Sequence, residues 1–188
     1  MTTGEKIATV VAVATVLQFI ALVVTIWIQR STAKRQSRAY VFPDNINIWD
    51  GTTVKPPDLS KTNIPLINML IKNLGQTPAY DVRSVAMLKI IEPDNIRNVK
   101  LPALTGASLN NIGPNGAISK NFWFDRALTP NEIVDVSSGA KHIYLIGRIE
   151  YRDAFKQKRF TNFRMSYNGN FPAPVMLFTF SESGNESN

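Results

Sequence analysis

Two side chains that could do chemistry stand four residues apart in the most patterned short stretch of the chain, KNLGQTPAYDV, from Lys72 to Val82. The Thr77 hydroxyl could act as a nucleophile or ligand, and the Asp81 carboxylate as a base or ligand. Acid–base chemistry needs a partner group positioned to exchange the proton, and no such partner stands at a recognised spacing. A structural role in a turn is therefore favoured over a catalytic one for this stretch.

Each conspicuous residue of this stretch has a mechanical use in a turn. Gly75 is expected to take a positive φ, and the Asn73 side chain is expected to bond nearby backbone. Pro78 fixes its own φ and pushes Thr77 into an extended conformation. The sequence therefore predicts that Asn73 to Pro78 form a loop between two strands at a sandwich edge.

Other signs of catalysis are scarce. The single histidine, His142, alternates with Ile143 at the start of an expected strand, where structural histidines are commoner than catalytic bases. The chain lacks a phosphate-binding Gly-x-x-x-x-Gly-Lys, a Gly-x-Ser-x-Gly elbow and a His-Glu-x-x-His, and it has no cysteine. We expect no metal and no cofactor, and we favour a non-enzymatic protein over an enzyme with an unrecognised site.

A basic, aromatic hairpin is the candidate interaction site. Its basic residues cluster around Tyr151, Phe155, Phe160 and Phe163, and they are Arg152, Lys156, Lys158, Arg159 and Arg164. Such a tip could bind anionic lipid headgroups or nucleic acid. The alternative, which we favour, is a solvated hairpin whose aromatic residues alternate into the core. Nucleic acid is the weaker of the two ligands, because the basic residues would have to merge into one continuous patch.

The strongest single feature is an apolar run of 22 residues without a charge, from Ile7 to Ile28. As a helix it would be about 33 Å long, close to the roughly 30 Å hydrocarbon core of a bilayer. A cleaved signal peptide is the alternative, but signal sequences have shorter apolar regions. We predict a tail at 1–6, a transmembrane helix at 7–28 and a basic juxtamembrane linker at 29–38.

The charges beside this run predict its orientation. Arg30, Lys34, Arg35 and Arg38 follow the span, whereas the short N-terminal tail offers Lys6. The positive-inside rule then places the N-terminus outside and the remainder of the chain in the cytoplasm. The whole chain carries a formal net charge of +7, and much of that excess lies in these flanks.

One face of the expected span could bind a second copy. Its small or polar residues recur every three or four positions, at Val11, Ala14, Gln18, Ala21 and Thr25. Small side chains let two helices approach closely, and a glutamine amide can bond across the contact. The alternative is that alanine, threonine and one glutamine are tolerated in an ordinary membrane helix.

After Arg38 the pattern changes to short, alternating runs rich in β-branched and aromatic residues, separated by turn signals such as Lys55-Pro56-Pro57-Asp58. They predict a mainly β domain at 39–180, an antiparallel immunoglobulin-like β-sandwich. Thr129 to Glu132 carries a capping pattern that predicts one short helix ending at Gly139. The polar tail, 181–188, is expected to be disordered. The expected strands are Ala39–Phe42, Asn45–Trp49, Ile64–Lys72, Ala79–Ile91, Ala117–Phe124, Lys141–Tyr151, Arg159–Tyr167 and Val175–Phe180.

Several motifs together resemble an uncharacterised bacterial family of single-span membrane proteins. They are Arg38-Ala39-Tyr40-Val41, Asn73-x-Gly75-x-Thr77-Pro78-Ala79-x-x-Val82, Gly147-x-Ile149-x-Tyr151-x-Asp153-x-Phe155 and Arg159-x-Thr161-x-Phe163. The Asn-x-Gly turn is also similar to that of bacterial immunoglobulin-like adhesion modules, which implies a β-sandwich but no activity. The family tends to have a glycine where this chain has Lys156 and a cysteine where it has Arg164, so the hairpin turn is expected to differ.

The function that these observations favour is a membrane-anchored, non-enzymatic β-sandwich that binds a protein partner or supports a membrane complex. The partners expected are the lipid bilayer, a membrane or cytoplasmic protein and, through the helix, a second copy. A membrane-tethered enzyme and a hairpin that binds anionic lipid or nucleic acid remain the alternatives.

Overall fold

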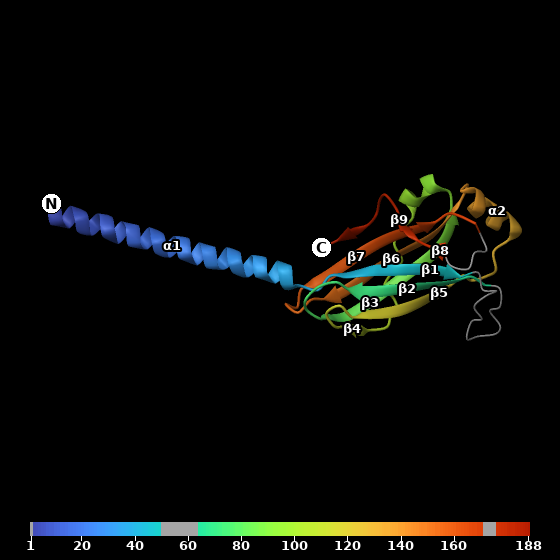
Figure 1. The fold of residues 1–188 in the computed structure, drawn as a ribbon, viewed down its shortest axis with the longest axis horizontal. Coiled ribbons are helices and arrows are strands. Elements are labelled where there is room, and N and C mark those ends of the chain that lie inside the picture. Colours follow the sequence, from blue (N-terminus) through green and yellow to red (C-terminus); the bar gives the residue numbers. More distant parts are fainter. Residues whose placement is uncertain (1, 50–63, 171–175) are drawn as a thin grey trace. The chain divides into compact units, whose positions relative to one another are not determined.

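The computed structural model describes residues 2–49, 64–170 and 176–188. It consists of two units, Met1–Arg38 and Ala39–Asn188, each of which we describe by itself. The first unit is one helix, α1 (Thr3–Ser37, blue in Figure 1), whose last turn contains Lys34 and Arg35. The basic stretch that we expected as a linker is thus helical as far as Ser37, because it contains good helix formers and neither glycine nor proline.

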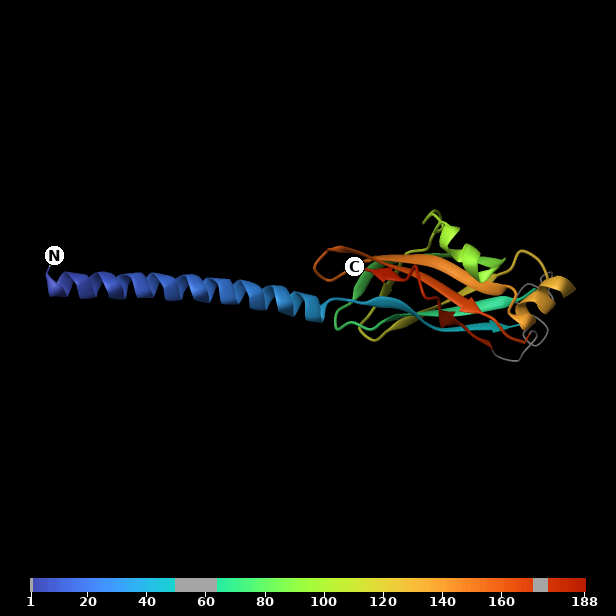
Figure 2. The same cartoon turned by 90° about the horizontal axis from the view of Figure 1, so that it is seen from above.

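The second unit is mainly β and has two layers of antiparallel strands (Figures 1 and 2), as the alternating pattern predicts. Sheet 1 has the order β5-β2-β1-β8. Its strands are β1 (Val41–Trp49), β2 (Leu66–Asn73), β5 (Ala117–Trp123) and β8 (Met176–Leu177). The seven-residue register of β2 with β5, from Leu66 opposite Trp123 to Lys72 opposite Ala117, contains no bulge.

Sheet 2 has the order β10-β7-β6-β3-β4, and β9 also pairs with β7. Its strands are β3 (Ala79–Ile91), β4 (Asn110–Ile112), β6 (His142–Arg152), β7 (Lys158–Tyr167), β9 (Thr179–Phe180) and β10 (Glu186–Ser187). The hairpin β6–β7 is regular from Ile143 opposite Tyr167 to Arg152 opposite Lys158. The stretch after Asn73 is a loop between two strands, as predicted, and the structure shows that it takes the chain from sheet 1 to sheet 2.

The core lies between the two sheets, and β6 contributes much of it. Ile143, Leu145, Ile149 and Tyr151 are all buried on one face of this strand, which confirms the predicted alternation. Gly147 continues that face, and a Cβ atom there would overlap the Val85 carbonyl oxygen and the Phe163 ring. A larger residue has no room at this position, because the Phe163 ring and the Val85 carbonyl oxygen occupy the space that its side chain would need.

The opposite face of β6 is buried as well, which the sequence reasoning missed. Tyr144 and Ile146 form a second, small apolar cluster with Ile96. Ile96 belongs to a 3-10 helix, η2 (Pro93–Asn98), which follows β3. Short 3-10 turns have weak sequence signals, so only the packing shows that this segment covers the outside of the sheet.

The predicted short helix is confirmed as α2 (Pro130–Ser138). Its capping box is complete, because the Thr129 side chain accepts from the Glu132 N–H while the Glu132 side chain accepts from the Thr129 N–H. Gly139 ends it in the left-handed conformation, with φ 79°. Helix α2 precedes β6, so it lies at the end of the sandwich away from the β6–β7 hairpin (Figure 1).

Two further local expectations differ from the structure. The two strands expected from Ala39 to Trp49 are one strand, β1, with an irregularity at Asn45, where φ is 25°. The tail expected to be disordered instead forms β10, which pairs Glu186 with Asn162 of β7. The pairing is reinforced because the Asn185 and Asn188 side chains accept from backbone N–H groups of β7. The turn expected at 55–58 and the predicted strand start at 175 lie outside the described residues.

Candidate functional site

The loop after β2 uses its polar groups to hold the fold together. Asn73 is fully buried, and its side-chain oxygen accepts from the N–H groups of Tyr40 (3.1 Å) and Gly75 (3.0 Å). Its side-chain nitrogen donates to three backbone carbonyls, those of Thr77 (2.8 Å), Ile112 (3.2 Å) and Gly113 (3.1 Å). One amide thus joins the start of β1, the loop itself and the turn before β5.

The prediction for Gly75 is wrong. The glycines with positive φ in the described part of the chain are Gly106, Gly139 and Gly184. The bond from the Gly75 N–H to the Asn73 side chain closes the turn without a left-handed residue. The positive φ falls instead on Asp81, at 52°, where the register of β3 shifts.

The two groups that could have done chemistry in this stretch have separate surroundings. Asp81 is exposed, its N–H donates to the Asn111 side chain at 3.0 Å, and its carboxylate lies 3.5 Å from Arg152. The Thr77 hydroxyl is buried and has no hydrogen-bond partner among the described residues. The geometry therefore supports a structural role for this loop and not a catalytic one.

A second buried polar side chain organises the β6–β7 hairpin. Asp153 is 1% exposed and accepts from the Phe155 and Gln157 N–H groups, each at 2.9 Å. It also accepts from Arg159 at 3.0 Å, so that cation neutralises the buried carboxylate. Lys156 takes the left-handed conformation in this loop, with φ 61°.

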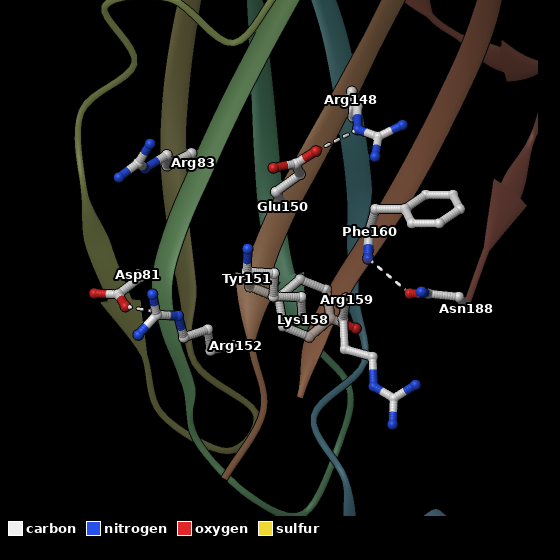
Figure 3. A pocket seen from close by; sticks show the side chains of 10 residues that line it. All are labelled: Asp81, Arg83, Arg148, Glu150, Tyr151, Arg152, Lys158, Arg159, Phe160 and Asn188. Atoms are coloured by element: carbon white, nitrogen blue, oxygen red, sulfur yellow. Dashed lines mark hydrogen bonds and ion pairs between the residues drawn. The ribbon is translucent and has the colours of Figure 1, made fainter. Parts of the chain in front are cut away.

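A shallow groove of about 350 Å³ lies on the outer face of sheet 2, and we call it the basic groove (Figure 3). It is lined from β3, β6, β7 and the C-terminal residue, by Asp81, Arg83, Arg148, Glu150, Tyr151, Arg152, Lys158, Arg159, Phe160 and Asn188. Strand alternation explains part of the set, because Arg148, Glu150 and Arg152 are two residues apart and share the outer face of β6.

The charges in the basic groove are only partly paired. Arg148 bonds Glu150 at 2.7 Å, and its guanidinium lies over the Phe160 ring at 4.5 Å (Figure 3). Arg83 and Lys158 are exposed, and neither forms an ion pair with a described residue. The groove therefore has excess positive charge beside an aromatic ring, a composition that suits an acidic partner.

The structure brings together some of the predicted basic residues and separates others. Arg152 and Lys158 line the groove, Lys156 lies in the hairpin loop, and Arg159 lines the groove but is bound to Asp153. Arg164 lies farther along β7, opposite Ile146, and its side chain donates to the Val99 carbonyl at 3.0 Å. It fastens the segment after η2 to the sheet rather than extending the cluster.

Of the aromatic residues expected at the tip, Phe163 is in the core, and Tyr151 is buried but borders the groove. Phe155 lies half-buried in the hairpin loop, and Phe160 lines the groove. Sequence reasoning missed Arg83 and Arg148. Strand alternation with Arg152 could have identified Arg148. No local signal identifies Arg83, because it reaches the groove through the pairing of β3 with β6, which places it opposite Glu150.

His142 lies elsewhere, at the start of β6. Its ring stacks on Tyr144 with centroids 5.8 Å apart, and its Nδ1 is 3.5 Å from the Tyr144 hydroxyl. Burial lowers the pKa of His142, which favours the neutral imidazole at neutral pH. At the base of α2, the hydrogen bond from Arg126 lowers the pKa of Glu132 to about 2, although partial burial acts in the opposite direction.

In the described part of the chain, one helix is long and apolar enough to cross a membrane, and the qualifying stretch runs from Val11 to Ser37. The candidate dimer positions, Val11, Ala14, Gln18, Ala21 and Thr25, all lie within it. The Thr25 hydroxyl donates to the Ala21 carbonyl at 2.8 Å, so it is already satisfied within the helix. Among these five residues, Gln18 has the side chain that can form the most hydrogen bonds, because its amide both donates and accepts.

A protein-family model matches most of this chain. The family model described as a domain of unknown function, DUF8453, matches residues 6–169, which include the apolar helix and most of the β unit. Neither the curated proteins nor the solved structures include a match to this chain. The chain therefore belongs to the family of the domain of unknown function DUF8453.

Proposed function

We propose that this protein is a membrane-anchored, non-enzymatic binding module, in which α1 holds an immunoglobulin-like β-sandwich at the bacterial inner membrane and the basic groove binds an acidic protein partner. The observation that carries the proposal is the groove itself. It is shallow, positively charged and built on three paired strands, with Arg148 over Phe160 and Arg83 free of any ion pair with a described residue.

The length and charge of α1 support the membrane anchor. Its uncharged run from Ile7 to Ile28 spans about 33 Å as a helix, and the helix continues to Ser37. Arg30, Lys34 and Arg35 thus follow the apolar segment directly, where they hold this flank on the cytoplasmic side. The binding module is then cytoplasmic.

The composition of the groove supports a protein partner over a small substrate. Arginine and aromatic residues are enriched at protein interfaces, and a guanidinium on an aromatic face offers both a charge and an apolar surface. Small-molecule sites are usually concave and mostly apolar, with a few convergent polar groups. The basic groove is instead open and lined largely by charged side chains from three strands.

Photo-crosslinking in cells tests the proposed partner. A benzophenone amino acid replaces Phe160 in the groove or, as the control, Val134, which is 64% exposed on α2. We expect one discrete adduct from position 160, identified by mass spectrometry as a protein with an acidic segment. Position 134 should give no adduct of that mass.

A charge-reversal pair tests the electrostatic basis. Arg83→Glu should reduce the position-160 adduct at least fivefold, because it places a negative charge in the groove. Lys89→Glu makes the same charge change at an exposed position of the same strand outside the groove, and it should leave the adduct unchanged. Equal yields in the two variants, or no adduct above the position-134 background, would contradict the proposal.

The same proposal includes a homodimer through α1. A glutamine amide is both donor and acceptor, so Gln18 residues of two helices can satisfy each other within the apolar segment, where water is absent. Gln18→Leu should reduce self-association of α1 in a membrane two-hybrid assay several-fold. Val24→Leu, a similar change at another exposed position of the helix, should not; equal signals from both variants would remove the dimer from the proposal.

A further inference from the structure

The end of the sandwich that carries the β6–β7 hairpin is also the end at which the chain enters from α1. The Tyr151 hydroxyl, at the end of β6, donates to the Ala39 carbonyl at 3.2 Å, and the Thr161 hydroxyl donates to the Val41 carbonyl at 2.7 Å. Val41 follows Ser37, the last residue of α1, by four positions. The hairpin is therefore at the tethered end of the sandwich.

Three exposed cations are concentrated there, and we call Arg152, Lys156 and Lys158 the basic tip. Arg152 and Lys158 are direct cross-strand partners, and like charges opposite each other in a sheet repel. The Asp81 carboxylate, 3.5 Å from Arg152, offsets part of this repulsion, but Lys158 has no ion pair with a described residue. An anion placed between the two side chains would relieve the repulsion.

Lys156 introduces backbone strain into the hairpin, and the hairpin does not need its side chain to form. Its φ of 61° lies in the region that glycine adopts without a steric penalty and lysine does not. The loop is held by the Asp153 carboxylate through the N–H groups of residues 155 and 157, and none of these bonds uses the Lys156 side chain. Backbone strain that the fold does not require is a recognised mark of functional positions.

From these observations we propose that the basic tip binds the anionic phospholipid headgroups of the bilayer that holds α1. A phosphate or phosphoglycerol group accepts hydrogen bonds from the Arg152 guanidinium and is attracted by the two lysines. The surface of an anionic leaflet attracts each basic side chain close to it, and the tether keeps this end of the sandwich near that surface. The inference rests on the membrane anchor proposed above and does not depend on the protein partner of the groove.

Lipid fits the tip better than nucleic acid does. Single-stranded nucleic acid binds through exposed aromatic rings on which bases stack. Tyr151 and Phe163 are buried, and Phe155 in the hairpin loop is half-buried. Tyr80, which lies opposite Arg152, is 44% exposed, but a single exposed ring does not provide the row of platforms on which successive bases stack. The charge of the tip, by contrast, matches a leaflet of anionic headgroups.

Fluorescence quenching in reconstituted vesicles tests the inference with the full chain. The protein contains no cysteine, so Ala154→Cys, at an exposed position of the hairpin loop, allows one fluorophore to be attached there. Asn131→Cys on α2, at the far end of the sandwich, is the matched control. The vesicles contain phosphatidylcholine alone or with 30% phosphatidylglycerol, and both carry a headgroup spin-labelled lipid that quenches at short range.

We expect the label at position 154 to be quenched at least threefold more in the anionic vesicles than in phosphatidylcholine. Salt at 0.5 M should remove most of the difference, because it screens exposed charges. The triple variant Arg152→Gln, Lys156→Gln, Lys158→Gln should remove it at low salt, whereas Lys89→Gln with Lys120→Gln should not. The label at position 131 should be equally weakly quenched in both lipids.

Equal quenching of position 154 in the two lipids, or an unchanged signal in the triple variant, would overturn the inference. Retention of a fluorescent oligonucleotide by the protein in phosphatidylcholine vesicles, lost in the triple variant, would also overturn it and would assign the tip to nucleic acid. Flotation of the vesicles after carbonate washing reports membrane insertion separately. A chain that inserts but shows no lipid-dependent quenching therefore refutes the tip and leaves the anchor intact.

Discussion

Replacing Asn73, the last residue of β2, should strongly destabilise the β unit. The side chain makes five hydrogen bonds to backbone groups of three segments, namely those of Tyr40, Gly75, Thr77, Ile112 and Gly113. Asn73→Ala removes the acceptor from two N–H groups, and a buried group left without its partner costs about 1–3 kcal/mol. Together with the lost donors, we expect a loss of about 4 kcal/mol of unfolding free energy, a large share of the roughly 5–15 kcal/mol of a typical domain.

Thermal unfolding of the full-length protein in mild detergent, followed by tryptophan fluorescence, measures this loss. For a unit of this size, 1 kcal/mol shifts Tm by about 2–4 °C, so Asn73→Ala should lower Tm by roughly 8–16 °C. Asn73→Asp should be at least as damaging. It keeps the acceptor for the Tyr40 and Gly75 N–H groups but turns a carboxylate oxygen toward three carbonyls.

Asn68→Ala is the matched control, because Asn68 lies on the same strand and bonds Ser119 and Asn121 at the surface. It should cost less than about 1 kcal/mol, since water replaces exposed hydrogen bonds. If Asn73→Asp unfolds like the parent protein, the bonds to the three carbonyls do not stabilise the turn. If Asn73→Ala and Asn68→Ala shift Tm equally, the central role of Asn73 is refuted.

Three further changes test other parts of the structure. Gly147→Ala should cost about 2–3 kcal/mol or more, because its Cβ would overlap a backbone oxygen of β3 and the Phe163 ring; an unchanged Tm would show that the sheet yields there. Lys156→Gly should raise stability by about 0.5–1 kcal/mol by removing the left-handed strain, and a lower Tm would show that the lysine stabilises the loop. The pKa of Glu132 is lowered from an ordinary value of 4.5 to about 2 in the folded protein, so its contribution is present above about pH 4.5 and is lost as pH falls toward 2. Glu132→Gln preserves the capping geometry but loses the charge bonded to Arg126. Because Arg126 is largely exposed and solvent screens the pair, the variant should be less stable than the parent protein by only about 1 kcal/mol at pH 7, and equally stable near pH 2. A constant difference in stability across this pH range would contradict the pKa assignment.

The sequence predicted the elements whose signals are local. An apolar run of 22 residues forms a helix in a bilayer, because its backbone groups must bond one another there, and the structure has this run within α1. The capping box of Thr129 and Glu132 and the stop at Gly139 lie within a single short segment, and α2 begins and ends accordingly. The alternation along β6 correctly predicted which of its residues face the space between the sheets, because side chains of a strand alternate by geometry.

The candidate site was predictable only in part. Arg152, Lys156 and Lys158 are close in sequence, and a hairpin necessarily brings them together. Arg159 and Arg164 belong to the same run, yet one neutralises the buried Asp153 and the other fastens the segment after η2. Neighbouring basic residues thus differ in what they contact, and their spacing does not reveal it.

Contacts between segments that are distant in the sequence determine the features that the sequence did not predict. Arg83 enters the basic groove through strand pairing, η2 covers Tyr144 and Ile146 from outside the sheet, and the tail pairs with β7. Asp81 and Lys156 are left-handed whereas Gly75 is not, because the register of β3 and the Asp153 bonds fix the backbone at these two positions. Sequence pattern determines local conformation and the side of a strand that is apolar, whereas the pairing of strands far apart in the chain determines which charges meet.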